Sequence, residues 1–90
     1  MRSVEYSSTF RRDYKRMMKR GASVEKLNAV LALLVHDTPL PARARPHGLS
    51  GEWKGFLECH IEPDWLLIYD LNEEGVLALH RTGTHVDLFE

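Results

Sequence analysis

The spacing of apolar residues changes along this chain from weak alternation to a helical repeat, and then to alternation again. Residues 2–6 alternate weakly and predict a short strand. Ser7 or Ser8 can cap the helix that follows, because a hydroxyl at this position accepts a free backbone N–H. The apolar stripe of that helix consists of Phe10, Tyr14, Met17 and Met18. Gly21 suits the left-handed residue at which such a helix ends.

A second helix is predicted to begin at Ser23 and to stop at Asp37-Thr38-Pro39. Its buried face consists of Val24, Leu27, Val30, Leu31 and Leu34, widened by Leu33 and Val35. The connection between the two helices is very short, so we expect them to lie antiparallel. Residues 38–52 then form a loop that is rich in proline and glycine.

From Trp53 onward the apolar period drops to two, which predicts β-strands. The predicted strands are Phe56–Ile61, Trp65–Leu71 and Val76–Thr82, joined by tight turns. The run Leu66-Leu67-Ile68 indicates that the middle strand is covered on both faces. The predicted fold class is therefore α+β: an N-terminal strand, a two-helix antiparallel hairpin and a largely antiparallel β-meander with the helices on one face.

Composition narrows the class of protein further. Ninety residues predict one domain, spanning residues 1–90. Cys59 is the only cysteine, which excludes an intrachain disulfide and a zinc ribbon. The sequence contains neither an apolar run of bilayer length nor an apolar signal core near Met1. We therefore expect a cytoplasmic protein with no membrane partner.

The net charge of −1 hides a strong asymmetry between the two halves of the chain. Residues 1–47 contain ten Lys and Arg against four Asp and Glu, whereas residues 48–90 contain two against nine. The basic residues of the first helix are Arg11, Arg12, Lys15, Arg16, Lys19 and Arg20. A basic half can meet nucleic acid while the acidic half faces elsewhere, although a solvated helix can be equally basic.

Most side chains that could carry out chemistry lie in the second half of the chain. They are His47, His60, Asp64, Trp65, Arg81, His85 and Phe89. An imidazole exchanges protons near neutral pH, a guanidinium fits phosphate oxygens, and aromatic rings stack on splayed bases. This combination is what cleavage of an RNA strand without a metal requires.

The predicted strands place only some of these residues. His60 and Asp64 flank one tight turn, so their backbones must be close. If the apolar residues of the first meander strand face the helices, His60 faces the other way together with Glu58. Periodicity does not decide whether His80 or Arg81 faces the open side, because both phases of that strand are apolar. His47 lies on the loop, where only the tertiary fold can bring it to the others.

Plain structural interpretations compete with the functional one. A single histidine at a strand end is usually solvated or hydrogen-bonded, and a tryptophan beside a strand is usually core. A metal could bind His60, Asp64 and His85, but the chain has no H-E-x-x-H motif and no cysteine pair. We therefore expect no metal and no other cofactor, and we interpret Cys59 as a small buried hydrophobe.

Several motifs, taken together, resemble the YafQ-like mRNA interferases of the RelE/ParE superfamily of bacterial type II toxins. They are Arg45-Pro46-His47-Gly48-Leu49, Gly51-Glu52-Trp53-Lys54-Gly55, His60-Ile61-Glu62-Pro63-Asp64-Trp65-Leu66-Leu67-Ile68-Tyr69 and Arg81-Thr82-Gly83-Thr84-His85-Val86-Asp87-Leu88-Phe89. The pattern Tyr6-x-x-x-Phe10-x-x-Asp13 and the helical pair agree with this resemblance, which covers essentially the whole chain.

The resemblance implies a RelE-like fold and metal-independent cleavage of mRNA in the ribosomal A site, by attack of a ribose 2′-hydroxyl on the adjacent phosphate. By position, the catalytic group falls on His47, His60, Asp64, Arg81 and His85, and the RNA contacts on Trp65 and Phe89. In this assignment His85 protonates the leaving oxygen and either His47 or His60 activates the 2′-hydroxyl. Asp64 orients a histidine or shares the role of base, and Arg81 clamps the phosphate.

The resemblance also implies the partners: a cognate antitoxin, the ribosome with its rRNA, and mRNA, all in the bacterial cytoplasm. The basic residues of the first helix would form the footprint on rRNA. Two other functions stay open: a gyrase-poisoning toxin of the ParE kind, and a small interaction protein whose polar cluster is structural.

Overall fold

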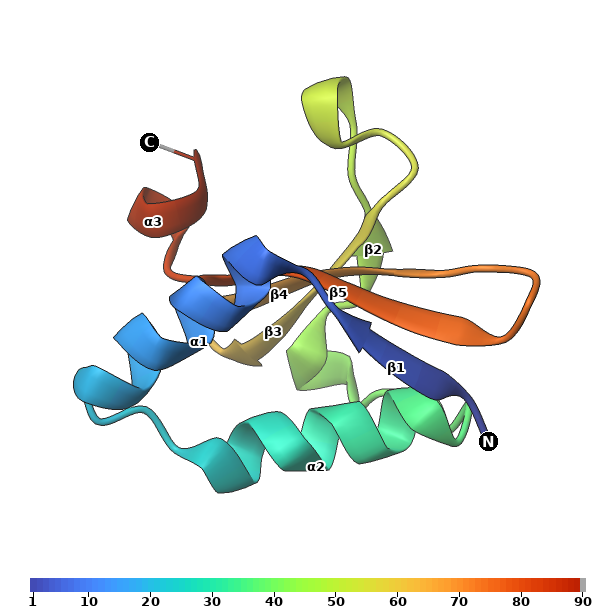
Figure 1. Ribbon diagram of the computed structural model, residues 1–90, viewed down its shortest axis with the longest axis horizontal. Helices are drawn as coiled ribbons and strands as arrows, with labels where there is room; N and C mark the ends of the chain where they lie inside the picture. Colours follow the sequence, from blue (N-terminus) through green and yellow to red (C-terminus); the bar gives the residue numbers. More distant parts are fainter. Residues whose placement is uncertain (90) are drawn as a thin grey trace.

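The computed structural model describes residues 1–89, which form a five-stranded sheet with two long helices on one face (Figure 1). The strands are β1 (Ser3–Tyr6), β2 (His47–Gly48), β3 (Leu57–Glu62), β4 (Trp65–Leu71) and β5 (Val76–Gly83), and the helices are α1 (Ser8–Lys19), α2 (Val24–Val35) and α3 (His85–Phe89). Two short 3-10 helices, Ala42–Ala44 and Gly51–Trp53, interrupt the long loop.

The strand order in the sheet is β1-β5-β4-β3-β2. β1 lies parallel to β5, whereas the other neighbouring strands are antiparallel. The predicted α+β class and the meander are confirmed. The two-residue strand β2, the short helix α3 and both 3-10 turns were not predicted, because none of them is long enough to show a repeat.

Local signals set the ends of both long helices, as the sequence predicts. Ser7 Oγ accepts the backbone N–H of Phe10 at 2.9 Å, and Ser23 Oγ accepts that of Lys26 at 3.4 Å. Gly21 adopts a φ of 87°, a left-handed conformation that glycine takes without steric cost. Neither of these helices nor α3 has the length and apolar character needed to cross a membrane.

Apolar side chains fill both faces of the sheet, and β4 is covered on each side. Trp65, Leu67 and Tyr69 face α1 and α2, while Leu66 and Ile68 face α3 and the loop around Trp53. Figure 1 shows α2 on one side of the sheet and α3 on the other. Cys59 lies in the larger core, where burial raises the pKa of its thiol to about 12. The interpretation of Cys59 as a buried hydrophobe is confirmed.

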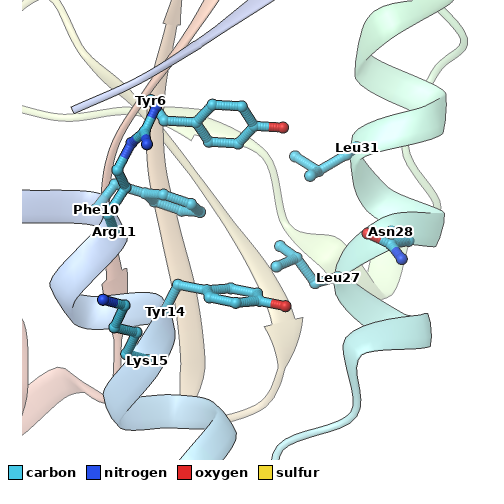
Figure 2. A pocket seen from close by; sticks show the side chains of 8 residues that line it. All are labelled: Tyr6, Phe10, Arg11, Tyr14, Lys15, Leu27, Asn28 and Leu31. Atoms are coloured by element: carbon cyan, nitrogen blue, oxygen red, sulfur yellow. The ribbon is translucent and has the colours of Figure 1, made fainter. Parts of the chain in front are cut away.

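The helices α1 and α2 run in opposite senses and diverge from their connecting turn (Figure 1). An apolar groove lies between them. We call it the α1–α2 groove; its volume is about 470 Å³. Its lining is Tyr6, Phe10, Arg11, Tyr14, Lys15, Leu27, Asn28 and Leu31. Figure 2 shows the three aromatic rings pointing from one wall toward the two leucines on the other, with Arg11 and Lys15 on the aromatic side.

A buried carboxylate fastens α1 to the edge of β5 that lies beyond the end of β1. Asp13, only 3% exposed, accepts the backbone N–H of Thr82 at 3.2 Å. It also accepts two hydrogen bonds from Arg81, at 2.7 and 3.2 Å, and one from Arg16 at 2.8 Å. Ser7 Oγ, just before α1, donates to the backbone carbonyl of His80 on the same edge of β5. Side chains of α1 therefore take the place of a strand along this part of the edge.

We expect Asp13→Asn to lower the free energy of unfolding by about 2–3 kcal/mol, because the amide nitrogen cannot accept the hydrogen bonds that a carboxylate oxygen receives from Arg81 and from the buried backbone N–H of Thr82. Urea denaturation measures the change. Asp37→Asn is the matched control: Asp37 pairs with Arg2 at the surface, where loss of the pair costs about 1 kcal/mol or less. Equal effects of the two substitutions would contradict the role given to Asp13.

Candidate active site

The turn between β3 and β4 brings His60 and Asp64 together, as the sequence predicts. A register shift between His60 and Glu62 bends β3 as it approaches this turn. His60 Nδ1 donates to the carbonyl of Pro63 at 3.2 Å, because a carbonyl can only accept. The ring is thereby oriented, and its Nε2 atom is free of a proton in the neutral imidazole.

The short strand β2 brings His47 to the same place. His47 is the cross-strand partner of Glu58 on β3, so the two side chains meet on one face of the sheet. His47 Nδ1 donates to the carbonyl of Arg45 at 2.8 Å. Its Nε2 lies 3.4 Å from Glu58 Oε1, and the Nε2 of His60 lies 3.9 Å from that same oxygen. The Nε2 atoms of two imidazoles therefore lie near one carboxylate, which attracts either ring once its Nε2 carries a proton.

His85, the first residue of α3, forms a separate pair with Asp64. Its Nδ1 lies 2.6 Å from Asp64 Oδ1, and its backbone N–H donates to that oxygen at 3.0 Å. The backbone N–H of His85 and then its imidazole hold the pKa of the Asp64 carboxyl below its ordinary value. Since the carboxylate is ionised, His85 Nδ1 carries the proton of this bond and Nε2 is left for other partners. The rings of His85 and His60 are 5.9 Å apart.

The three histidines and Glu58 share one open cleft of about 650 Å³, which we call the histidine cleft. Its lining is Arg45, Pro46, His47, Glu58, His60, Pro63 and His85. The two carboxylates beside the histidines differ in exposure: the side chain of Glu58 is 7% exposed and that of Asp64 is 64% exposed. Residues 1–89 contain no group of three or more His, Cys, Asp or Glu side chains placed to hold a metal ion together.

Arg81 lies outside the lining of the histidine cleft. Its Nε and Nη2 atoms hold Asp13, which raises the pKa of the guanidinium. A bulge in β5 decides its direction: Ile68 of β4 is paired with Arg81 and Tyr69 with Leu79, so His80 is the extra residue. The guanidinium that does line the cleft belongs to Arg45, which the sequence did not single out.

Trp65 corrects the sequence-based assignment of the RNA contacts. Its side chain belongs to the core and is 3% exposed, and its indole N–H donates to Thr82 Oγ1 at 2.8 Å. A ring in this position has no free face for a base. Phe89 is 44% exposed, so the prediction that it contacts RNA stays open.

The five basic residues of α1 and its C-cap Arg20 do not form one free surface. Arg16 pairs with Asp13 and Arg20 pairs with Asp87. Arg11 and Lys15 line the α1–α2 groove. Arg12 and Lys19 are exposed, and Arg12 makes a long hydrogen bond to Thr9. A footprint on rRNA therefore remains a prediction only for the part of this set that has no acidic partner.

Glu58 is the residue of the cleft that sequence reasoning left without a role. Its signal was present, because alternation along β3 puts Glu58 on the same face as His60. The missing information was its partner, since nothing local indicates that His47 pairs with β3.

Comparison with known proteins assigns the class. The family model described as bacterial toxin of type II toxin-antitoxin system, YafQ, matches residues 2–90. The mRNA interferase toxin YafQ of Escherichia coli K12 is 45% identical over 89 residues, which are 98% of this chain and 96% of that protein. The crystal structure of YafQ from E. coli BL21(DE3) superimposes with a TM-score of 0.92 at 43% identity, and all of both chains is covered.

YafQ in the E. coli DinJ–YafQ toxin–antitoxin complex gives a TM-score of 0.90 at 43% identity, with 99% of this chain and 98% of that chain covered. The fold and these matches define a bacterial toxin of the type II toxin–antitoxin class. Within that class, the chain belongs to the YafQ family.

We expect Trp65→Phe to lower the free energy of unfolding by about 1–3 kcal/mol, because Thr82 Oγ1 loses its donor and the smaller ring leaves a void. Phe89→Ala is the matched aromatic control on the surface and should change stability by about 0.5 kcal/mol or less. Thermal unfolding measures both. A Trp65→Phe protein as stable as the parent would contradict the core role of Trp65.

Proposed function

We propose that the chain is an endoribonuclease that enters the ribosomal A site, cuts the mRNA bound there and so inhibits translation. The reaction is attack of a ribose 2′-hydroxyl on the adjacent phosphate, which leaves a 2′,3′-cyclic phosphate and a 5′-hydroxyl. The observation that carries the proposal is the convergence of three imidazoles and the Glu58 carboxylate on one open cleft, with Asp64 bonded to one of those imidazoles. The name of the E. coli relative, an mRNA interferase, supports the substrate class.

His85 is the proposed general acid. Asp64 holds the Nδ1 proton of its ring and stabilises the imidazolium, so Nε2 can carry a second proton. That proton passes to the 5′-oxygen as its bond to phosphorus breaks. Because Asp64 is exposed and ionised, it orients the ring without competing for the proton.

His47 or His60 is the proposed general base. In both rings the Nδ1–H donates a hydrogen bond to a backbone carbonyl. Nε2 is therefore the nitrogen that can accept the proton of the 2′-hydroxyl. Glu58 lies next to both Nε2 atoms and stabilises whichever imidazolium forms. Because the Glu58 carboxylate is itself negative, the negative charge that develops on the phosphate needs a cation facing that phosphate.

Two guanidinium groups are candidates for this cation. Arg45 lines the cleft and is the nearer choice by position. Arg81, which the family resemblance assigns to the phosphate, presents Nη1 for such a contact, since Nε and Nη2 hold Asp13. Asp13 then fixes the direction of the Arg81 side chain while the remaining nitrogen meets the substrate.

We expect His85→Ala, and separately His47→Ala or His60→Ala, to reduce kcat by about 10²–10⁴-fold, the usual contribution of a positioned acid or base. The assay is cleavage of mRNA on purified ribosomes, with the ends of the products identified. His36→Ala is the matched control, because His36 is exposed at the end of α2, outside the cleft. Parental activity in His85→Ala, or products with a 5′-phosphate, would refute this mechanism.

The two alternative functions, a gyrase-poisoning toxin and a small interaction protein, predict different outcomes when the chain is expressed in bacteria. Growth arrest with cut mRNA supports the nuclease. Arrest with double-strand DNA breaks would instead identify a gyrase-poisoning toxin, and no arrest would leave the structural interpretation of the polar cluster. Three oriented imidazoles favour the nuclease, because a pure binding module has no need of proton carriers.

The cognate antitoxin is the proposed occupant of the α1–α2 groove. Tyr6 is 46% exposed and Tyr14 and Leu31 are partly exposed along the groove, while Arg11 and Lys15 make its rim positive. A segment with apolar anchors and acidic neighbours fits this combination. The complex of the E. coli relative with its antitoxin supports a protein partner of this kind.

Reversing the charge of the rim tests this assignment. We expect Arg11→Glu with Lys15→Glu to weaken antitoxin binding at least about tenfold, since like charges then face each other. Arg12→Glu with Lys19→Glu reverses the same number of charges at exposed positions of the same helix outside the groove lining, and should leave Kd nearly unchanged. Calorimetry with the purified antitoxin measures both. Equal Kd values for the two double variants would place the antitoxin elsewhere.

A further inference from the structure

Helix α3 carries His85 but has few apolar contacts to hold it in place. It has five residues, fewer than an isolated helix needs to persist in water. Leu88 is buried against Leu66 and Ile68, whereas Val86 and Phe89 are exposed. The orientation of α3 therefore depends strongly on its polar contacts.

Asp87 makes the polar contact that joins α3 to the end of α1. Arg20 Nη1 donates to Asp87 Oδ2 at 2.7 Å, and Arg20 Nη2 donates to Oδ1 at 3.1 Å. The backbone N–H of Thr84 donates to Oδ2 at 3.0 Å, so Asp87 also closes the first turn of its own helix. The Arg20 guanidinium holds the pKa of the Asp87 carboxyl well below its ordinary value. A two-pronged pair of this kind fixes direction as well as distance.

Gly83, the last residue of β5, leaves room for this arrangement. A Cβ atom at Gly83 would lie 3.0 Å from both Cβ and Oδ2 of Asp87. The Asp87 side chain therefore lies directly over the end of β5, between the sheet and Arg20. Any larger residue at this position would push Asp87 away from Arg20.

We propose that the Arg20–Asp87 ion pair is a positioning device, which holds α3 so that the His85 imidazole stays on Asp64 and faces the histidine cleft. The inference rests on the proposed nuclease function, in which His85 transfers a proton. The His85–Asp64 bond is solvent-exposed and constrains the ring only weakly by itself. Asp87 lies two residues further along α3 and is nearly buried, so it supplies the rigidity that the exposed pair lacks.

This role differs from that of an RNA contact, which is how the sequence presents Arg20. If Arg20 binds phosphate, Arg20→Ala weakens RNA binding, whereas Asp87→Ala removes a negative charge and strengthens it. If the two residues position α3, loss of either one has the same effect. The two substitutions therefore have opposite effects if Arg20 binds RNA, and the same effect if Arg20 and Asp87 position α3.

The test measures kcat and KM for cleavage of ribosome-bound mRNA. We expect Arg20→Ala and Asp87→Ala each to lower kcat about tenfold or more, because a small misplacement of an acid is costly, while KM changes less than about twofold. The double variant should be no worse than either single one, and Gly83→Ala should resemble them. Arg20→Lys keeps the positive charge but loses the two-pronged guanidinium contact, and its kcat should lie between those of Arg20→Ala and the parent. Arg2→Ala removes a surface ion pair, Arg2–Asp37, that touches neither α3 nor the histidine cleft; it is the matched control and should retain the parental kcat.

A second measurement does not depend on activity. Long-range ¹H–¹⁵N spectra report which ring nitrogen of His85 carries the proton. We expect the Nδ1–H form in the parent and a mixture of both forms in Asp87→Ala. An unchanged spectrum together with parental kcat would overturn the proposal, as would a raised KM in Arg20→Ala with a lowered KM in Asp87→Ala. An inactive parent would refute the nuclease instead, and the spectra would still test the positioning role.

Discussion

The site depends first on the contact between the Asp13 carboxylate and the edge of β5. A buried carboxylate is stable only when its oxygens are satisfied, and here donors from Arg16, Arg81 and Thr82 satisfy them. The contact fixes α1 against the half of β5 that β1 does not cover. Because β5 leads directly into α3, the position of His85 is set relative to the helices as well as the sheet.

Backbone carbonyls and carboxylates together decide where the protons of the cleft lie. Backbone carbonyls accept hydrogen bonds from the Nδ1–H groups of His47 and His60, while ionised Asp64 accepts one from that of His85. All three rings therefore have Nε2 available for chemistry. The buried Glu58 lies beside two rings and the exposed Asp64 beside the third, so the proposed base and acid have separate carboxylate partners.

Sequence reasoning succeeded where two residues are joined by a short, regular piece of chain. It placed His60 close to Asp64 across one turn and put Glu58 on the same face as His60, because both conclusions need only the period of a strand. It failed for Arg81, whose direction is set by a bulge that no alternation indicates. It also failed for Trp65, since the chemistry of an indole is the same whether its ring is buried or free, and only packing distinguishes the two.

By itself the sequence determined the two long helices and their N-caps, the strands of the meander, the α+β class and, through its motifs, the family. These features follow from repeats and turn residues within a few positions of one another, where local conformational preferences act. The tertiary structure alone decided three pairs: His47 with Glu58, Asp13 with Arg81, and Arg20 with Asp87. The residues of the second pair are 68 positions apart in the sequence, and those of the third pair are 67 apart. Partners that distant are selected by strand register, by bulges and by the burial of charge, and each of these exists only once the chain has packed.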